Sequence, residues 1–191
     1  MVHVQYHRPL REQIDDARRD AGRLEQGGVD GLLFENWGEK FDDRFVSREV
    51  QDTLSMIITN VAQNTRLPYG VNVLPLDYQA AFIIAGRTDA KFVQVDTLVD
   101  RVRTDYSNQF VIDIDPAHVL ACRRDLKLGH VALFANIQTK HYQTIPATKS
   151  IETSARQAVQ HSADVLVVTG VTTGKSPSVE RLARVRHVAG N

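Results

Sequence analysis

The sequence predicts an α/β fold with parallel strands, of the TIM (β/α)8-barrel type, with about six strand–helix units. Short apolar runs alternate with longer amphipathic segments along the whole chain. The apolar runs are continuous, which indicates strands buried on both faces. The units recur at intervals of roughly 25 to 40 residues, close to the roughly 30 expected of such a barrel. A doubly wound sheet is the alternative, but the first strand lacks the glycine-rich turn that dinucleotide folds use.

Six β-rich runs are predicted to be the parallel strands. Most are rich in valine, leucine, isoleucine and phenylalanine, as strands covered by helices should be. The predicted strands are 2–6, Asp30–Asn36, Tyr69–Leu74, Lys91–Leu98, His130–Ile137 and Asp164–Gly170. The polar stretch from Val99 to about Asp113 and the segment through Pro146 are predicted to be loops.

Helices are predicted between these strands. Pro9–Gln26 repeats apolar residues every three or four positions, and Gly27 follows it as a helix-ending glycine should. Ser47 can cap the second helix, whose apolar face reaches Val61. Asp115 can cap the fourth. The remaining helices are predicted at Asp77–Gly86, from Pro116 to near Gly129, from about Ser150, and from Pro177 to the end.

Composition and charge exclude several classes of protein. The chain has 191 residues with 23 basic and 23 acidic side chains, and this zero net charge argues against a nucleic-acid partner. No apolar run approaches the roughly 18 residues that cross a bilayer, and the N-terminus lacks a signal pattern. The one cysteine, Cys122, cannot form an intramolecular disulfide, which favours the reducing cytoplasm. One domain over residues 1–191 is expected.

Polar residues stand at the carboxyl ends of the predicted strands, where parallel α/β folds place their chemistry. A barrel interior normally holds branched aliphatic side chains, so these polar residues call for a reason. Structural alternatives stay open: loop capping for Glu35 and Asn36, and an ion pair with Arg101 or Arg103 for Asp96. The candidates from the first four strands are His3, Glu35, Asn36, Asn72, Asp77 and Asp96.

The last two strands add two further groups of candidates. Asn136 ends the fifth strand and is followed by Lys140 and His141, where a lysine at a barrel mouth can act as a base or form a Schiff base. The segment Thr169–Gly174 leads to a helix N-terminus and could present amides to an anion. Its candidate ligand-binding residues are Thr169, Gly170, Thr173 and Gly174. A tight turn and a solvated lysine are the structural alternatives.

A metal site is a weaker hypothesis. Glu35, Asp96, His3 and His141 would supply a mixed carboxylate and imidazole set that suits zinc or manganese. No close-spaced pair of ligands supports this set, so no metal is predicted. The cofactor stays unknown.

The chain resembles the BtpA family over nearly its whole length. The motifs that carry the resemblance are GGVDGLLFENWGE at Gly27–Glu39, YGVNVL followed by Asp77, FVQVDTL, FANIQTKH at Phe134–His141 and VLVVTGVTTGKSP at Val165–Pro177. The family is similar to ribulose-phosphate-binding TIM barrels. Some members are linked to photosystem I biogenesis.

The chain departs from the family pattern at several positions. Gln94-Val95-Asp96 stands where the family usually has Arg-Val-Asn, and Asn136 stands where it usually has aspartate. The resemblance also implies two further strand–helix units, which bind phosphate in barrels of this kind. Completion of the barrel by a partner chain and irregular closure of the sheet are alternatives, but we expect the chain to be a shortened form of a longer protein.

Two functions follow from these residues and from the resemblance. The first is binding or conversion of a small phosphorylated sugar- or nucleoside-like ligand, with Glu35, Lys140 and Asp96 as catalytic residues and the other candidates binding the ligand. The second is a non-enzymatic assembly or stability factor for a membrane complex. Whether the chain is an enzyme stays open, as do self-association and a peripheral contact with a membrane.

Overall fold

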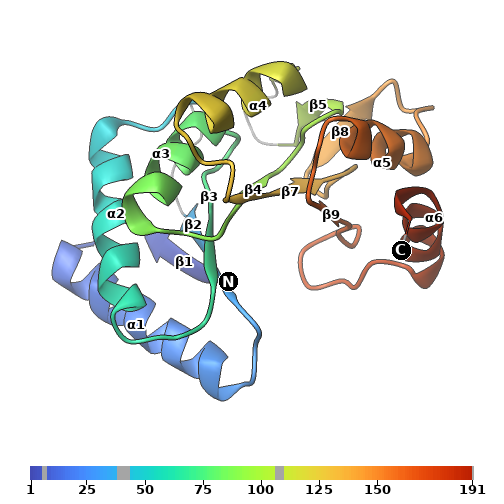
Figure 1. Ribbon diagram of the computed structural model, residues 1–191. Helices are drawn as coiled ribbons and strands as arrows, with labels where there is room; N and C mark the ends of the chain where they lie inside the picture. The colour runs from blue at the N-terminus through green and yellow to red at the C-terminus, as the bar shows by residue number, and fades with distance from the viewer. Residues whose placement is uncertain (6–7, 38–43, 106–109, 191) are drawn as a thin grey trace. The chain divides into compact units, whose positions relative to one another are not determined.

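A computed structural model describes residues 1–5, 8–37, 44–105 and 110–190. The chain divides into two compact units, labelled by element in Figure 1. The first unit holds Met1–Gln94 and Asp125–Val131, and the second holds Val95–Arg124 and residues 132–190. Among the described residues, no helix is long and apolar enough to span a membrane. The prediction of one domain over the chain stays a prediction.

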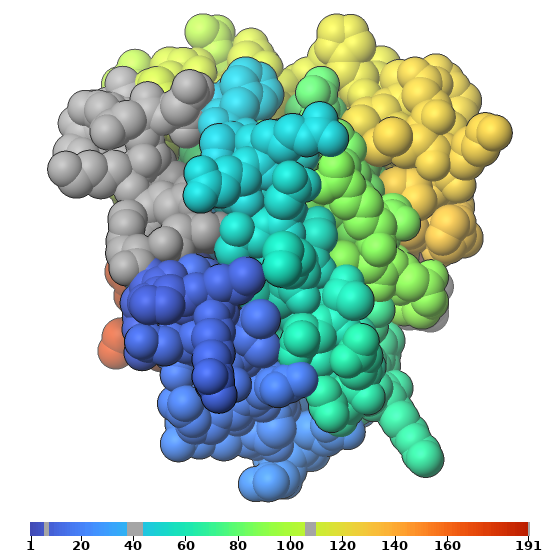
Figure 2. Space-filling model, turned by 90° about the vertical axis from the view of Figure 1, so that its left-hand side faces the viewer, coloured from blue at the N-terminus to red at the C-terminus, as the bar shows by residue number. Residues whose placement is uncertain are grey.

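The first unit alternates strands and helices. Its strands pair in parallel in the order β1, β2, β3, β4. The helices α1, α2 and α3 pack side by side, and Figure 2 shows the face that they form. The elements are β1 (Val2–Gln5), α1 (Leu10–Gln26), β2 (Leu32–Trp37), α2 (Arg48–Ala62), β3 (Tyr69–Asn72), α3 (Tyr78–Thr88) and β4 (Phe92–Val95).

Alternation along the strands separates the core of the first unit from its polar side. Val2 and Val4 of β1 are buried, while His3 and Gln5, which alternate with them, are exposed. The residues of α2 that face the core recur at helical spacing: Leu54, Ile57, Ile58 and Val61 are at most 2% exposed. The polar side of the strands therefore remains for chemistry.

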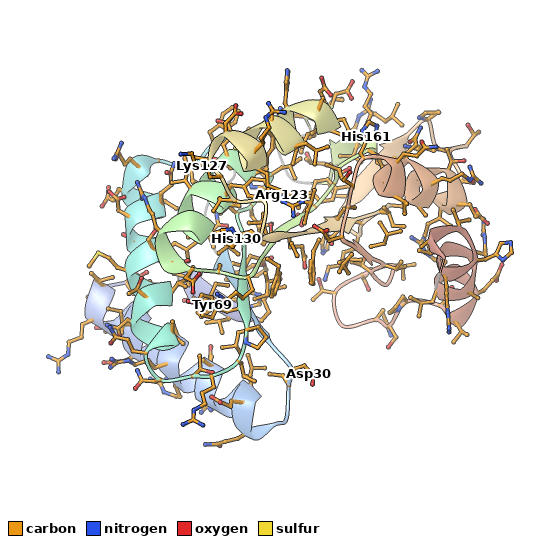
Figure 3. The ribbon with its side chains drawn as sticks, in the orientation of Figure 1. Asp30, Tyr69, Arg123, Lys127, His130 and His161 are labelled. Atoms are coloured by element: carbon orange, nitrogen blue, oxygen red, sulfur yellow. The ribbon has the colours of Figure 1, made fainter. Side chains whose placement is uncertain are left out.

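Specific residues fix these elements in place. The Ser47 hydroxyl accepts a hydrogen bond from the Val50 N–H, as predicted for a helix cap. Gly70 is required in β3, because a Cβ there would lie 2.2 Å from the Phe92 ring on β4. The Tyr69 hydroxyl donates to the Thr88 carbonyl at 2.5 Å and ties β3 to the end of α3 (Figure 3).

The second unit combines parallel strands with two packed helices. Strands β7 (Ala132–Asn136) and β9 (Val165–Val167) pair in parallel, and α5 (Ile151–Gln160) packs against α6 (Val179–Ala189). The apolar cluster beneath them includes Ile137, Ile151, Ala155, Ala158 and Val185.

The start of β9 is held by a charged side chain. The Asp164 carboxylate accepts from the Leu133 N–H at 2.7 Å and lies 3.2 Å from a guanidinium nitrogen of Arg123. Arg123 belongs to α4 (Pro116–Asp125), so one carboxylate joins that helix to the parallel strands of this unit.

The prediction of loops at Val99–Asp113 and through Pro146 was wrong. Strands β5 (Arg101–Thr104), β6 (Val111–Ile112) and β8 (Tyr142–Ile145) form an antiparallel sheet in the order β6, β5, β8. β5 alternates exposed arginines with buried Val102 and Thr104, so its apolar content is too low to resemble the buried parallel strands.

Several predicted boundaries also differ from the structure. The last helix begins at Val179, because Ser178 rather than Pro177 caps it by accepting from the Arg181 N–H. α4 ends at Asp125, and Lys127 beyond it takes a left-handed φ of 59°, which ends a helix.

Candidate functional site

Three polar side chains lie in one row across the first unit. The parallel register places His3 beside Glu35, and Glu35 beside Asn72. The Asn72 amide donates to Glu35 Oε2 at 3.0 Å, and His3 Nε2 lies 3.6 Å from Glu35 Oε1. Glu35 is 7% and Asn72 2% exposed. We call His3, Glu35 and Asn72 the Glu35 cluster: a buried carboxylate oriented by an amide and close to a titratable imidazole.

Two of the predicted ligand-binding residues, Asn36 and Asp77, bind backbone groups of neighbouring loops. The Asn36 amide donates to the Leu74 carbonyl at 3.1 Å and accepts from the Leu74 N–H at 2.6 Å. The Asp77 carboxylate caps α3 through the Ala80 N–H and also accepts from the Val46 N–H. Both side chains are buried, and their hydrogen bonds hold the backbone at Leu74, Val46 and Ala80.

Burial raises the pKa of Asp77 above its ordinary value, since desolvation disfavours the charged carboxylate. The hydrogen bonds from Ala80 and Val46 oppose this effect without cancelling it.

Trp37 lies at the end of β2, and the sequence prediction overlooked it. Its ring stacks on that of His3 with a centroid distance of 5.0 Å and an interplanar angle of 29°. A cavity of about 440 Å³ lies beside this pair. Trp37 is the only tryptophan of the chain, and its position outside the core is the signal that could have marked it.

The second unit holds a separate carboxylate, Asp96, directly after β4. Its Oδ1 accepts from the Asn136 amide at 3.3 Å, and its Oδ2 accepts from the Tyr142 hydroxyl at 2.9 Å. We call Asp96, Asn136 and Tyr142 the Asp96 cluster. Asn136 Oδ1 is buried and has no hydrogen-bond partner within the described part of the chain. Tyr142 is absent from the predicted site because the sequence predicts a loop at this segment.

The predicted residues after β7 and β9 meet in pairs. The Lys140 N–H donates to the Thr169 hydroxyl at 3.0 Å, and His141 Nε2 lies 3.1 Å from the Thr173 hydroxyl. The Lys140 residue is half-buried, whereas His141 and Thr173 are exposed. The loop after β9 is therefore tied to the loop after β7.

Glycines shape the loop after β9. A Cβ on Gly170 would lie 1.9 Å from the Lys175 carbonyl oxygen, so only glycine fits this approach. Gly174 takes a φ of 79°, which also favours glycine. The Lys175 N–H also donates to the Thr172 carbonyl at 3.1 Å, so the segment contains a turn, and its predicted binding of an anion stays a prediction.

A buried ion pair supports the loop after β7, and no local pattern predicted it. Asp100 Oδ1 lies 2.7 Å from the Lys149 ammonium and accepts from the Ser154 hydroxyl at 2.6 Å. Its Oδ2 accepts from the Gln138 N–H at 3.0 Å. The Asp100 side chain is fully buried and that of Lys149 is 13% exposed.

The charged and thiol side chains do not gather as metal ligands do. Within the ranges that the structure describes, no group of three or more histidine, cysteine, aspartate or glutamate side chains could hold an ion.

Comparison with known proteins identifies the family of the chain. The model of the BtpA family matches residues 2–190. The chain belongs to the BtpA family. It is 30% identical, over 92% of its length, to the photosystem I biogenesis protein BtpA of Synechocystis sp.. It is 32% identical, also over 92% of its length, to an uncharacterized protein of Archaeoglobus fulgidus. The chain spans 60% of the first of these relatives and 69% of the second.

Solved structures confirm the predicted fold class. The chain is similar to dihydropteroate synthase of Xanthomonas albilineans, with a TM-score of 0.58 and 15% identity over 98% of this chain and 65% of that one. A second structure of the same enzyme gives a TM-score of 0.54. The BtpA-family chain therefore has an α/β fold of the TIM-barrel type. The roles of the individual site residues stay predictions.

Proposed function

We propose that this BtpA-family protein binds and converts a small sugar- or nucleoside-like metabolite at the carboxyl ends of its strands. The observation that carries the proposal is the Glu35 cluster. TIM barrels place their chemistry at these strand ends, and a buried carboxylate there is costly unless it is used or paired. The pairing of Glu35 is with an orienting amide and an imidazole, which suits proton transfer.

Each residue of the cluster has a distinct part in this proposal. Glu35 is the general base, and Asn72 orients its carboxylate by donating to Oε2. His3, 3.6 Å from Oε1, can pass the proton to solvent because its side chain is 44% exposed.

We propose roles for the candidate residues of the second unit within that unit alone. Asp96, held by Asn136 and Tyr142, orients polar groups of a ligand. Lys140 supplies a positive charge or a covalent amine beside the loop after β9. A phosphate group held in the second unit would be bound by Lys140 and by hydroxyls and amides of Thr169–Gly174.

Thermal unfolding with added ligands tests the proposal. The chain is melted alone and with phosphosugars, nucleosides and divalent metals, since a ligand that binds the folded state raises the midpoint. We expect one ligand class to raise it, and the Glu35→Gln and Lys140→Met variants to lose that rise. Lys91→Met, at an exposed lysine paired with Asp89, is the control that should keep it. A rise that persists in both site variants would exclude these residues from the site.

The name of the Synechocystis relative favours a second candidate, an assembly or stability factor for a membrane complex. Here the strand-end residues would be structural, and the working surface would be external. The triple variant Glu35→Ala, Asn72→Ala and Lys140→Ala separates the two functions. If it replaces BtpA in a Synechocystis strain that lacks the relative, as measured by photosystem I content, the assembly function is supported. Loss of this replacement by a folded triple variant would favour the enzyme.

A further inference from the structure

The cavity beside β1 is lined by two kinds of side chain. His3, Gln5 and Trp37 come from strand ends, where the register places Gln5 beside Trp37. Arg8, Gln13, Asp16, Arg19 and Asp20 come from α1 and the residues just before it. Its volume of about 440 Å³ lies within the roughly 300–1,000 Å³ of small-molecule sites.

The lining is polar but carries no net charge, since two arginines face two aspartates. Asp16 binds both arginines: its Oδ1 lies 2.9 Å from Arg19, and its Oδ2 contacts Arg8. Arg8 also bonds Glu12 at 2.8 Å. A phosphate would have to displace a carboxylate from each guanidinium, so an anionic group is disfavoured here and an uncharged polar ligand is favoured.

Trp37 supplies a planar surface for such a ligand. Its side chain is 48% exposed, although a tryptophan gains most from burial. Stacking on His3 holds the indole in one orientation. A preorganised and partly exposed indole beside a cavity suits stacking with a flat ring, as aromatic side chains stack on nucleobases.

Two amides can read the edge of a ring. Each glutamine amide offers one acceptor and two N–H donors, which complement the alternating donors and acceptors of a nitrogen heterocycle. The Gln13 Nε2 donates to the Arg8 carbonyl at 2.7 Å, which fixes its amide. Gln13 Oε1 is buried and has no hydrogen-bond partner among the residues that the structure describes. A ligand N–H that reached this acceptor would recover the cost of leaving it unpaired.

We propose that this cavity binds an uncharged planar nitrogen heterocycle of the nucleobase class, stacked on Trp37 and read by Gln5 and Gln13. The inference rests on the proposed function, because it names the ligand class for the site that includes His3. It selects a nucleoside-like ligand over a simple phosphosugar.

The fluorescence of Trp37 tests this directly, because no other tryptophan contributes to the emission. The 191-residue chain is titrated with adenosine, guanosine, cytidine and ribose 5-phosphate. We expect at least one nucleoside to quench Trp37 with saturation and ribose 5-phosphate to leave the emission unchanged. Nucleosides that neither quench the emission nor release heat in calorimetry would overturn the proposal.

Variants identify the residue that binds the ring. Measured by calorimetry, Trp37→Leu should weaken nucleoside binding about tenfold or more, the range of base stacking on an aromatic side chain. Phe45→Leu is the matched control, because Phe45 is also an exposed aromatic residue, at 55%, but does not line the cavity. Equal nucleoside affinity in Trp37→Leu, Phe45→Leu and the unmodified chain would also overturn the proposal.

Glu35→Gln separates this inference from the proposed function. If ribose 5-phosphate binds in a Glu35-dependent manner and no nucleoside binds, the proposed function is supported and the heterocycle inference fails. If neither class of probe binds a chain that unfolds cooperatively, both fail. Nucleoside binding that needs Trp37 supports the inference whatever the effect of Glu35→Gln.

Discussion

The two carboxylate clusters differ in what surrounds the carboxylate. Glu35, in the first unit, faces an imidazole that is 44% exposed, and the cavity beside β1 adjoins that imidazole. Asp96, in the second unit, accepts from an amide and a phenol hydroxyl. A partner that can gain or lose a proton near neutral pH suits acid–base chemistry, whereas neutral donors suit orientation. This difference is the reason why our proposal gives proton transfer to the Glu35 cluster and positioning to the Asp96 cluster.

The second unit also carries the buried ion pair of Asp100 and Lys149, and Asp100 follows Asp96 closely in the sequence. The largest loss of stability that we predict comes from breaking this pair. Asp100→Ala would leave the Lys149 ammonium, 13% exposed, without its carboxylate. Breaking a buried pair in this way costs about 3–5 kcal/mol. We expect urea denaturation to show a loss of this size in the free energy of unfolding.

Asp113→Ala is the control for that loss. Asp113 belongs to the same unit and pairs with Arg101 at 3.6 Å, but its side chain is 68% exposed. Surface pairs contribute about 0–1 kcal/mol, so this variant should unfold much like the unmodified chain. Equal losses in the two variants would show that Asp100 does not stabilise the second unit through its ion pair.

Replacing the two orienting amides sharpens the comparison of the clusters. Asn72→Leu removes a 3.0 Å hydrogen bond to a carboxylate, which costs about 1.5–3 kcal/mol. Asn136→Leu removes a longer bond of 3.3 Å and also a buried acceptor without a partner among the described residues, so it should cost less than about 1 kcal/mol. Urea denaturation of both variants measures the difference.

The order of these two losses is the decisive result. A larger loss for Asn136→Leu would mean that the Asp96 cluster, rather than the Glu35 cluster, holds the more tightly organised carboxylate. The assignment of proton transfer would then move to Asp96.

The sequence predicted the location of Glu35 and Asn72 because strand order and period place polar residues at the same ends of parallel strands. The same rule could not tell these residues from Asn36 and Asp77, whose side chains bind backbone groups. That distinction depends on which backbone N–H and carbonyl groups of the loops lie within hydrogen-bonding distance of each side chain. The path of a loop leaves no periodic pattern in the sequence, so these partners cannot be predicted from it.

Contacts between distant segments escaped the sequence for a related reason. Tyr142 reaches Asp96 only because β8 pairs with β5 in a short antiparallel sheet, and the alternation of β5 is too brief to predict. The pairing of Asp100 with Lys149 likewise joins segments far apart in the chain. Fold class follows from repeated patterns, whereas these partners follow from tertiary packing.

The pH dependence of stability distinguishes a buried carboxylate of the first unit from the exposed ones. Burial raises the pKa of Asp77 above 3.8, so the folded state binds its proton more tightly than the unfolded state. Its contribution to stability is then greatest below pH 3.8 and falls as pH rises through the raised pKa. Asp77→Asn keeps an acceptor for the Ala80 N–H and should remove this decline.

Urea denaturation between about pH 3 and 7 measures the effect of Asp77. The control is Asp115→Asn, because Asp115 also accepts from a backbone N–H at a helix start but is exposed. The decline with pH should persist in Asp115→Asn. A decline of the same size in Asp77→Asn would assign it to another group.

The smallest expected effect belongs to the exposed pair of Glu152 and Arg184, which joins α5 to α6 in the second unit. Two guanidinium nitrogens of Arg184 bond the two carboxylate oxygens at 2.5 and 2.8 Å. These bonds lower the pKa of Glu152 from 4.5 to about 2. A lowered carboxylate pKa stabilises the folded state above pH 4.5, and this contribution is lost as pH falls through about 2.

Titration of the Glu152 side-chain carboxyl carbon by nuclear magnetic resonance measures this pKa. Arg184→Ala should return the midpoint toward 4.5, while Arg186→Ala, at another exposed arginine of α6, should leave it low. Added salt should also raise the midpoint, because solvent ions screen an exposed pair far more than a buried pair such as Asp100 and Lys149. A midpoint that ignores both Arg184→Ala and salt would mean that the α5 N-terminus, rather than the arginine, stabilises the Glu152 carboxylate.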